Sequence, residues 1–115
     1  MLPSKNRLNK KEVETIFKRG ESFRSDFLLL KIIKNKKHSP PRFSVIVPIK
    51  VSKKSTERNK IKRQIRESLR GEIDNIKEVD GIVIALGSIL NKNFKEINKE
   101  INKLLEISNL RLKNR

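Results

Sequence analysis

The apolar segment at residues 27–33 is the feature that most constrains the fold of this chain, since Lys31 alone interrupts it. Its length suits a strand, because a membrane-spanning helix needs about 18 apolar residues or more. Side chains alternate along a strand, so Leu28, Leu30 and Ile32 face one side and the remaining side chains face the other. Both sides are largely apolar. We therefore expect a strand over residues 27–34 that is covered, at least in part, on both faces.

Three further segments have a polar capping residue followed by apolar side chains at helical spacing. The expected helices and their caps are 8–20 with Asn9, 55–70 with Ser55, and a last helix from residue 93 with Asn93. Glu12 and Glu96 each follow an asparagine by three residues, as in a capping box. Gly20 and Gly71 are placed to end the first two helices. The apolar side of the last helix is expected to consist of Phe94, Ile97, Ile101, Leu104 and Leu105.

Two shorter apolar segments predict strands at residues 42–47 and 82–86. Pro48 ends the first of them, and Gly81 and Gly87 bound the second. The order of elements is helix, strands, helix, strand, helix, without an internal repeat. This order indicates a single α+β domain over all 115 residues. The basic tail at residues 109–115 is expected to be frayed.

The charge of the chain points to a polyanionic partner. It has 29 lysine and arginine residues against 13 acidic ones, a formal net charge of +16. So small a domain repels itself unless a polyanion neutralises it, and nucleic acid is the commonest such partner. A codon bias toward lysine would also raise the charge. The chain has no cysteine, which excludes disulfides and cysteine-ligated zinc.

Catalytic and targeting signals are weak. His38 is the single histidine and lies in a polar turn without neighbouring ligands, and Asp26, Asp74 and Asp80 are too dispersed to indicate a metal site. A stand-alone nuclease is therefore disfavoured. The first residues lack the apolar core of a signal peptide. We expect a cytoplasmic protein that has neither a membrane partner nor a small-molecule substrate.

The expected helix at residues 55–70 carries most of the functional signal. Ile61, Ile65 and Leu69 form a narrow apolar stripe at helical spacing. Cationic and amide side chains occupy about a third of the circumference beside this stripe: Asn59, Lys62, Arg63, Arg66 and Arg70. One sign of charge on one face favours contact with RNA or DNA over an ordinary solvated surface. The preceding connector adds Lys50, Lys53 and Lys54.

The sequence of this helix resembles a family signature. Residues 58–67 read Arg-Asn-Lys-Ile-Lys-Arg-Gln-Ile-Arg-Glu. They are similar to the signature of the ribonuclease P protein component family, whose core is Arg-Asn-Arg, and Lys60 replaces the second arginine of that core. Weaker matches keep the family's order along the chain: Asn6, Arg7 and Leu8, then Phe17, Lys18 and Gly20, then Val47 and Lys50, and finally residues 80–85.

The resemblance implies a fold that pattern reading alone does not give. It is a two-layer sandwich like the second domain of a small-subunit ribosomal protein, with three helices and a four-stranded sheet in the order α-β-β-β-α-β-α. A short strand is implied near residues 22–24. The crossover through the basic helix would join parallel strands with the left hand, against the general rule.

The resemblance also implies a division of labour. The catalytic RNA subunit would hold Mg²⁺ and remove the 5′ leader of precursor tRNA, so that no protein side chain is catalytic or ligates metal. Contacts with the RNA subunit are implied for Lys50, Lys53, Lys54, Arg58, Asn59, Lys60, Lys62, Arg63, Arg66 and Arg70. Contacts with the leader are implied for Val13, Phe17 and Leu30. The alternative is a structural RNA-binding protein of ribosomal type without a nuclease role.

Overall fold

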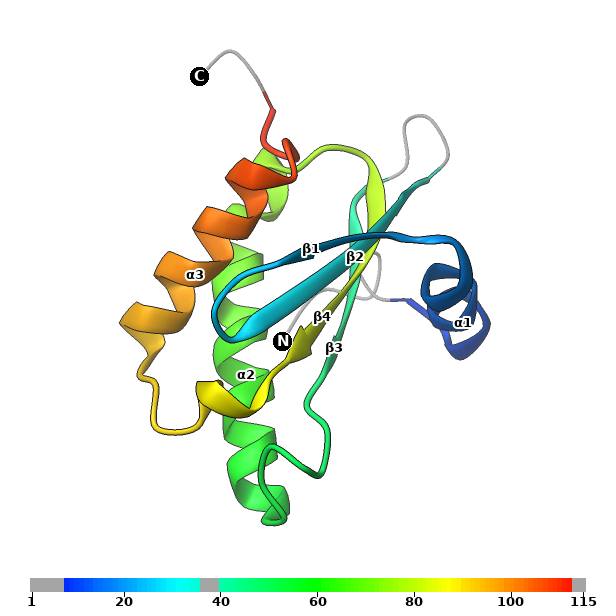
Figure 1. Ribbon diagram of the computed structural model, residues 1–115. Helices are drawn as coiled ribbons and strands as arrows, with labels where there is room; N and C mark the ends of the chain where they lie inside the picture. The colour runs from blue at the N-terminus through cyan, green and yellow to red at the C-terminus, as the bar shows by residue number, and fades with distance from the viewer. Residues whose placement is uncertain (1–7, 36–39, 113–115) are drawn as a thin grey trace.

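The computed structural model describes residues 8–35 and 40–112, which form an α+β fold (Figure 1). The main elements follow one another in the order expected from the sequence. They are α1 (Lys10–Arg19), β1 (Glu21–Arg24), β2 (Leu28–Lys34), β3 (Arg42–Ile46), α2 (Ser55–Glu72), β4 (Val79–Ala85) and α3 (Phe94–Ile107). Two short 3₁₀ turns, η2 (Ile73–Asn75) and η3 (Gly87–Ile89), follow α2 and β4.

The strands form one mixed sheet in the order β1-β2-β4-β3. The pairs β1–β2 and β2–β4 are antiparallel, whereas β3 and β4 are parallel. Parallel neighbours need a long crossover, and α2 supplies it. In this strand order β3 lies at an edge of the sheet, beside β4.

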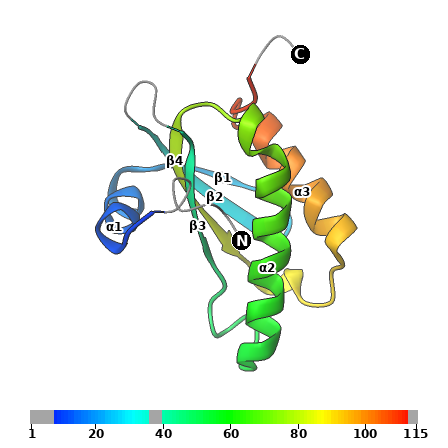
Figure 2. The same ribbon diagram turned by 180° about the vertical axis from the view of Figure 1, so that it is seen from behind.

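Helices cover the sheet unequally on its two faces. Helices α2 and α3 pack on one face and α1 lies against the other (Figures 1 and 2). On the two-helix side, Leu28 and Leu30 of β2 are buried in the main apolar core. On the α1 side, Ile16 and Ile82 are fully buried outside that core cluster. The predicted partial covering of both faces of this strand is therefore confirmed.

Gly81 lies inside a strand, which corrects the prediction that it precedes one. β4 begins at Val79, and the ring of Phe43 on the neighbouring strand sits over Gly81. A Cβ atom at this position would lie 2.7 Å from Phe43 Cε1. The glycine is therefore explained by close packing of an aromatic ring and not by a turn.

Two of the three predicted helix starts are confirmed. Asn9 and Asn93 both cap their helices in complete capping boxes with Glu12 and Glu96. The prediction for the middle helix is wrong at both ends. Lys54 is the N-cap and makes no side-chain capping hydrogen bond, so Ser55 is already the first helical residue. α2 also continues through residue 71 and passes directly into η2.

The C-terminal segment is ordered as far as the structure describes it, so the predicted fraying is wrong for residues 109–112. Leu110 is buried, and its carbonyl accepts a 2.8 Å hydrogen bond from the backbone N–H of Lys77. Arg111 Nη1 lies 2.8 Å from Glu72 Oε1. Residues 113–115 lie outside the described part. No helix in the described residues is long and apolar enough to cross a membrane.

Candidate nucleic-acid interface

The cations of α2 gather on the side of the helix that faces away from α3. Ser68 marks the α3 side, because its hydroxyl donates a 2.6 Å hydrogen bond to Asn98 Oδ1. Ile61, Ile65 and Leu69 are buried. A helix turns by about 100° per residue, so the side chains that lie past Leu69, on the side away from Ser68, occupy a sector of about 100°. This sector lies next to edge strand β3. We call this sector the basic flank; it holds Asn59, Lys62, Arg63, Arg66 and Arg70.

The basic flank has little internal neutralisation. Arg70 Nη1 lies 3.4 Å from Glu67 Oε1, and both side chains are largely exposed. No ion pair joins Lys62, Arg63 or Arg66 to another of the described residues. Neighbouring like charges on a helix are destabilising, so an anionic partner would relieve their repulsion. Lys62, Arg63 and Arg66 are thus predicted contacts that the structure brings together on one side of α2.

The connector before α2 extends the cationic surface. Lys50, Lys53 and Lys54 are all exposed. Arg58 behaves differently, since it is half-buried and its Nη1 donates a 2.9 Å hydrogen bond to the carbonyl of Ser52. Arg58 therefore stabilises the loop, and the structure does not bring it onto the basic flank with the other predicted contacts.

Lys60 also lies apart from the basic flank. Together with Gln64 it lines a groove of about 310 Å³ on the other side of α2, against the connection from β4 to α3. The helical positions of the two residues were available from the sequence, because Lys60 and Gln64 are each two residues from Lys62 and residues two apart differ by about 200° around a helix. The partner wall of the groove comes from a distant segment, and only the fold reveals it.

The residues predicted to contact the leader are divided between two faces of the sheet. Phe17 on α1 is 44% exposed and Val13 is half-buried. Leu30 is 2% exposed and points into the core under α2 and α3. The prediction for Leu30 is therefore wrong, because strand alternation puts it on the face opposite α1.

The α1 face instead presents Lys31, which the sequence reasoning missed. Its Nζ lies 5.7 Å from the centroid of the Phe17 ring and donates a 3.2 Å hydrogen bond to the Phe17 carbonyl. A cation beside an exposed aromatic ring is a suitable surface for single-stranded nucleic acid. The signal was present in the sequence, since Lys31 is the one polar residue in the apolar run.

An ion-pair cluster joins α1 to the sheet. Arg42 Nη1 lies 2.6 Å from Glu12 Oε2, and Arg42 Nη2 lies 2.7 Å from Asp80 Oδ2. Asp80 is buried and also accepts a 3.2 Å hydrogen bond from Asn35 Nδ2. The hydrogen bond to Asp80 raises the pKa of Arg42 above its usual value against the opposing effect of burial, and the charge of Asp80 and then the carboxylate of Glu12 add to the increase. The cluster thus holds a permanent cation between two elements.

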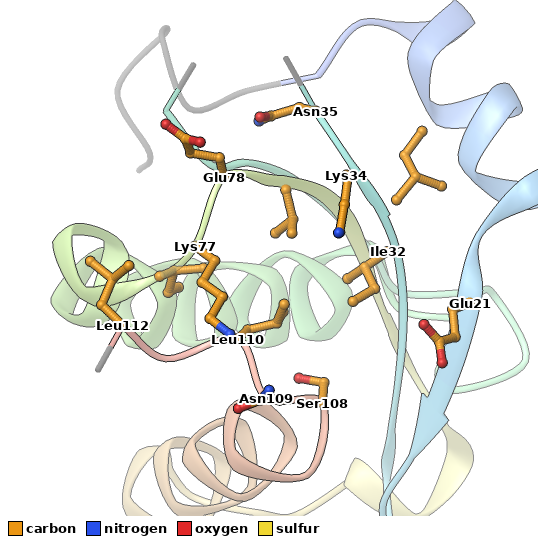
Figure 3. Close-up of a pocket in the computed structure, with 13 residues that line it drawn as sticks. Glu21, Ile32, Lys34, Asn35, Lys77, Glu78, Ser108, Asn109, Leu110 and Leu112 are labelled. Atoms are coloured by element: carbon orange, nitrogen blue, oxygen red, sulfur yellow. The ribbon is translucent and has the colours of Figure 1, made fainter. Parts of the chain in front are cut away.

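A larger cavity than the groove beside Lys60 lies elsewhere, at the end of the sheet where β2 ends and β4 begins (Figure 3). Its volume is about 800 Å³, and its walls mix Lys34 and Lys77 with Glu21 and Glu78. It is separate from both the basic flank and Phe17. No group of three histidine, cysteine, aspartate or glutamate side chains in the described residues could hold a metal ion. His38 and the motif residues Asn6 and Arg7 fall outside the described part.

Known proteins resemble this chain in sequence over most of its length. A family model described as Ribonuclease P matches residues 2–109. The ribonuclease P protein component of Rickettsia canadensis is 39% identical over 113 residues, which cover 92% of this chain and 93% of that protein. The corresponding protein of Clostridium perfringens is 36% identical over 107 residues, covering 87% and 85%.

Solved structures share the fold. The ribonuclease P protein of Staphylococcus aureus superposes with a TM-score of 0.84 at 26% identity, covering 91% of this chain and 96% of that chain. The protein from Thermotoga maritima gives a TM-score of 0.79 at 27% identity, covering 88% and 96%. From the matched family model, the relatives and the shared fold, we conclude that this chain belongs to the ribonuclease P protein component family and is a component of a tRNA-processing endoribonuclease.

Proposed function

We propose that the basic flank of α2 docks on the catalytic RNA subunit of ribonuclease P. The observation that carries the proposal is the gathering of four cations on one side of α2, where Arg63 and Arg70 are exposed and Lys62 and Arg66 are half-buried. Arginine offers a planar fork that takes two phosphate oxygens at once, and each neutralised phosphate releases counterions. The exposed lysines of the connector extend the same surface toward β3.

The α1 face is the proposed site for the single-stranded 5′ leader of precursor tRNA. Phe17 supplies an exposed ring for a base, Lys31 supplies a cation beside it, and Val13 adds apolar surface on the same helix. Aromatic rings and cations bind single strands with little dependence on base sequence. This suits a leader whose sequence differs from one precursor to the next.

The two proposed surfaces lie on opposite faces of the sheet and border the same edge strand. β3 contacts α2 on one face, and Arg42 at its start contacts α1 on the other. A small protein with this layout can hold the RNA subunit and the leader at the same time. Its contribution is then to raise the affinity of the holoenzyme for leader-bearing substrate.

The chemistry of cleavage is assigned to the RNA subunit. Among the described protein residues, no cluster of three histidine, cysteine or acidic side chains is placed to hold a metal ion. When bound to the RNA, Mg²⁺ would supply the activated water and the charge stabilisation for phosphodiester hydrolysis. The protein's own residues bind and orient RNA.

Reconstitution at low Mg²⁺ tests the proposal. We expect no cleavage of precursor tRNA by the purified protein, and site-specific cleavage at the mature 5′ end when a bacterial RNA subunit is added. Cleavage by the protein alone would contradict the division of labour. A protein that leaves the rate of the RNA subunit unchanged at low Mg²⁺ would contradict the role in substrate binding.

A further inference from the structure

The groove beside α2 has no role in the docking described above. It lies between the N-terminal half of α2 and the connection from β4 to α3. Figures 1 and 2 both show this connection, with η3, beside α2. The groove opens on the side of α2 opposite the basic flank, because Lys60 and Gln64 line it and Arg63 and Arg66 do not.

One feature that the fold leaves unexplained lies in this groove, and a second follows it in the sequence. Lys60 belongs to the motif expected to contact RNA, yet it is separated from the basic flank. Phe94 was expected on the buried side of α3, yet it is 43% exposed. It follows Asn93 directly, which lines the groove, and Leu90 on the same connection is also exposed. Large apolar side chains exposed next to cations indicate a binding surface.

The polar groups of the groove suit a nucleotide. Lys60 and Lys92 line opposite walls of the groove, and the ammonium of Lys92 lies 5.4 Å from the centroid of the Phe27 ring, so Lys60 is the cation offered to a ligand. Glu57, the acid in the lining, already accepts a hydrogen bond from the Ser52 hydroxyl. The amides of Gln64 and Asn91 can each donate and accept hydrogen bonds, as the edge of a base requires.

We propose that this groove binds one unpaired nucleotide of the RNA subunit. The base contacts Leu90 and extends to Phe94, which follows the lining residue Asn93, and Lys60 binds the phosphate. Recognition of unstacked bases by aromatic side chains and amides is the usual way in which proteins read single-stranded RNA. The inference rests on the proposed docking of α2. It selects the RNA subunit over the leader because the groove shares α2 with the basic flank, whereas α1 lies on the other face of the sheet.

Affinity for the RNA subunit alone tests the stacking contact. Loss of a base–aromatic contact through Phe94→Ser should raise Kd about fivefold or more. The matched control is Ile107→Ser, at the other end of the same helix, since Ile107 is 51% exposed and distant from the groove. Phe94→Trp keeps an aromatic surface and should restore wild-type affinity. An unchanged Kd for Phe94→Ser would overturn the proposal.

Cross-linking identifies the bound RNA. The chain has no cysteine, so Leu90→Cys gives one attachment point for a photoreactive group. In the holoenzyme with precursor tRNA bound, we expect a cross-link to an unpaired nucleotide of the RNA subunit, and none there from Ile107→Cys. A cross-link to precursor tRNA instead would overturn the assignment. If Arg63→Glu with Arg66→Glu weakens RNA binding and Phe94→Ser does not, the groove inference alone fails; if neither weakens it, the docking proposal fails too.

Discussion

Arg42 at the start of β3 is paired with Glu12 on α1 at 2.6 Å, and the same guanidinium holds the buried Asp80 of β4 at 2.7 Å. Glu12 has a second task, because its Oε1 accepts the backbone N–H of Asn9 in the capping box. One carboxylate therefore completes the N-terminal cap of α1 and also links this helix to the sheet. The position of the proposed leader site depends on this tie.

Glu12→Gln should separate the two tasks. Glutamine still completes a capping box, whereas the ion pair with Arg42 is lost. The expected cost is about 1 kcal/mol or less in unfolding free energy. Affinity of the holoenzyme for leader-bearing precursor tRNA should fall about two- to fivefold, because α1 is held less firmly. Binding competition between leader-bearing and leaderless substrates measures the effect.

Glu96→Gln is the matched control for that substitution. Glu96 closes an equivalent capping box with Asn93 on α3, and it has no ion pair with another described residue. Glu96→Gln also changes the net charge by the same amount as Glu12→Gln. We expect it to leave leader affinity unchanged. Equal effects of the two substitutions would show that the tie between Arg42 and Glu12 has no part in leader binding.

Phe17→Leu should weaken leader binding while keeping an apolar side chain on α1. Loss of one base–aromatic contact lowers affinity about fivefold or more. Lys31→Gln should weaken leader binding too, and should reduce its salt dependence because one cation is lost. Both variants should bind leaderless tRNA and the RNA subunit as the wild type does. Equal losses on both substrates would place these residues outside the leader site.

The two glycines at positions 71 and 81 should respond to alanine with opposite signs. A Cβ at Gly81 would lie 2.7 Å from the buried Phe43 ring, so overpacking should cost about 1–3 kcal/mol. Nothing lies within 4 Å of the corresponding Cβ at Gly71, which is inside α2, so alanine there should add about 0.5–1 kcal/mol. Urea denaturation measures both; a neutral Gly81→Ala would contradict the packing described for β4.

The elements that local chemistry dictates were predictable from the sequence. The two asparagine capping boxes, the apolar strand β2 and the amphipathic stripe of α2 each depend on residues within a few positions of one another. The features that could not be predicted depend on contacts between residues far apart in the sequence. Gly81 looked like a boundary because Phe43 is far away in the sequence. Residues 109–112 looked unattached because the backbone groups with which they form hydrogen bonds, on Asn75 and Lys77, come much earlier in the sequence.

The residues of the candidate site also divide into those that local spacing predicts and those that only the fold reveals. The basic flank could be read from helical spacing, and the resemblance added its partner. The role of Arg58 in the loop and the groove around Lys60 required the fold, because Ser52 and Leu90 come from segments outside the helix. Leu30 was misplaced for a different reason: strand alternation already put it with Leu28 and Ile32, on the face turned away from α1.

The most direct test of the account is the salt dependence of RNA-subunit binding by the double variant Arg63→Glu with Arg66→Glu. Its control is Lys99→Glu with Lys103→Glu, an equal charge change on exposed residues of α3. The account predicts a large loss of affinity and a slope of log K against log salt that is smaller by about 1–2 for the α2 variant. The control should keep the wild-type slope. Equal losses for the two variants would mean that net charge, and not the basic flank, determines binding.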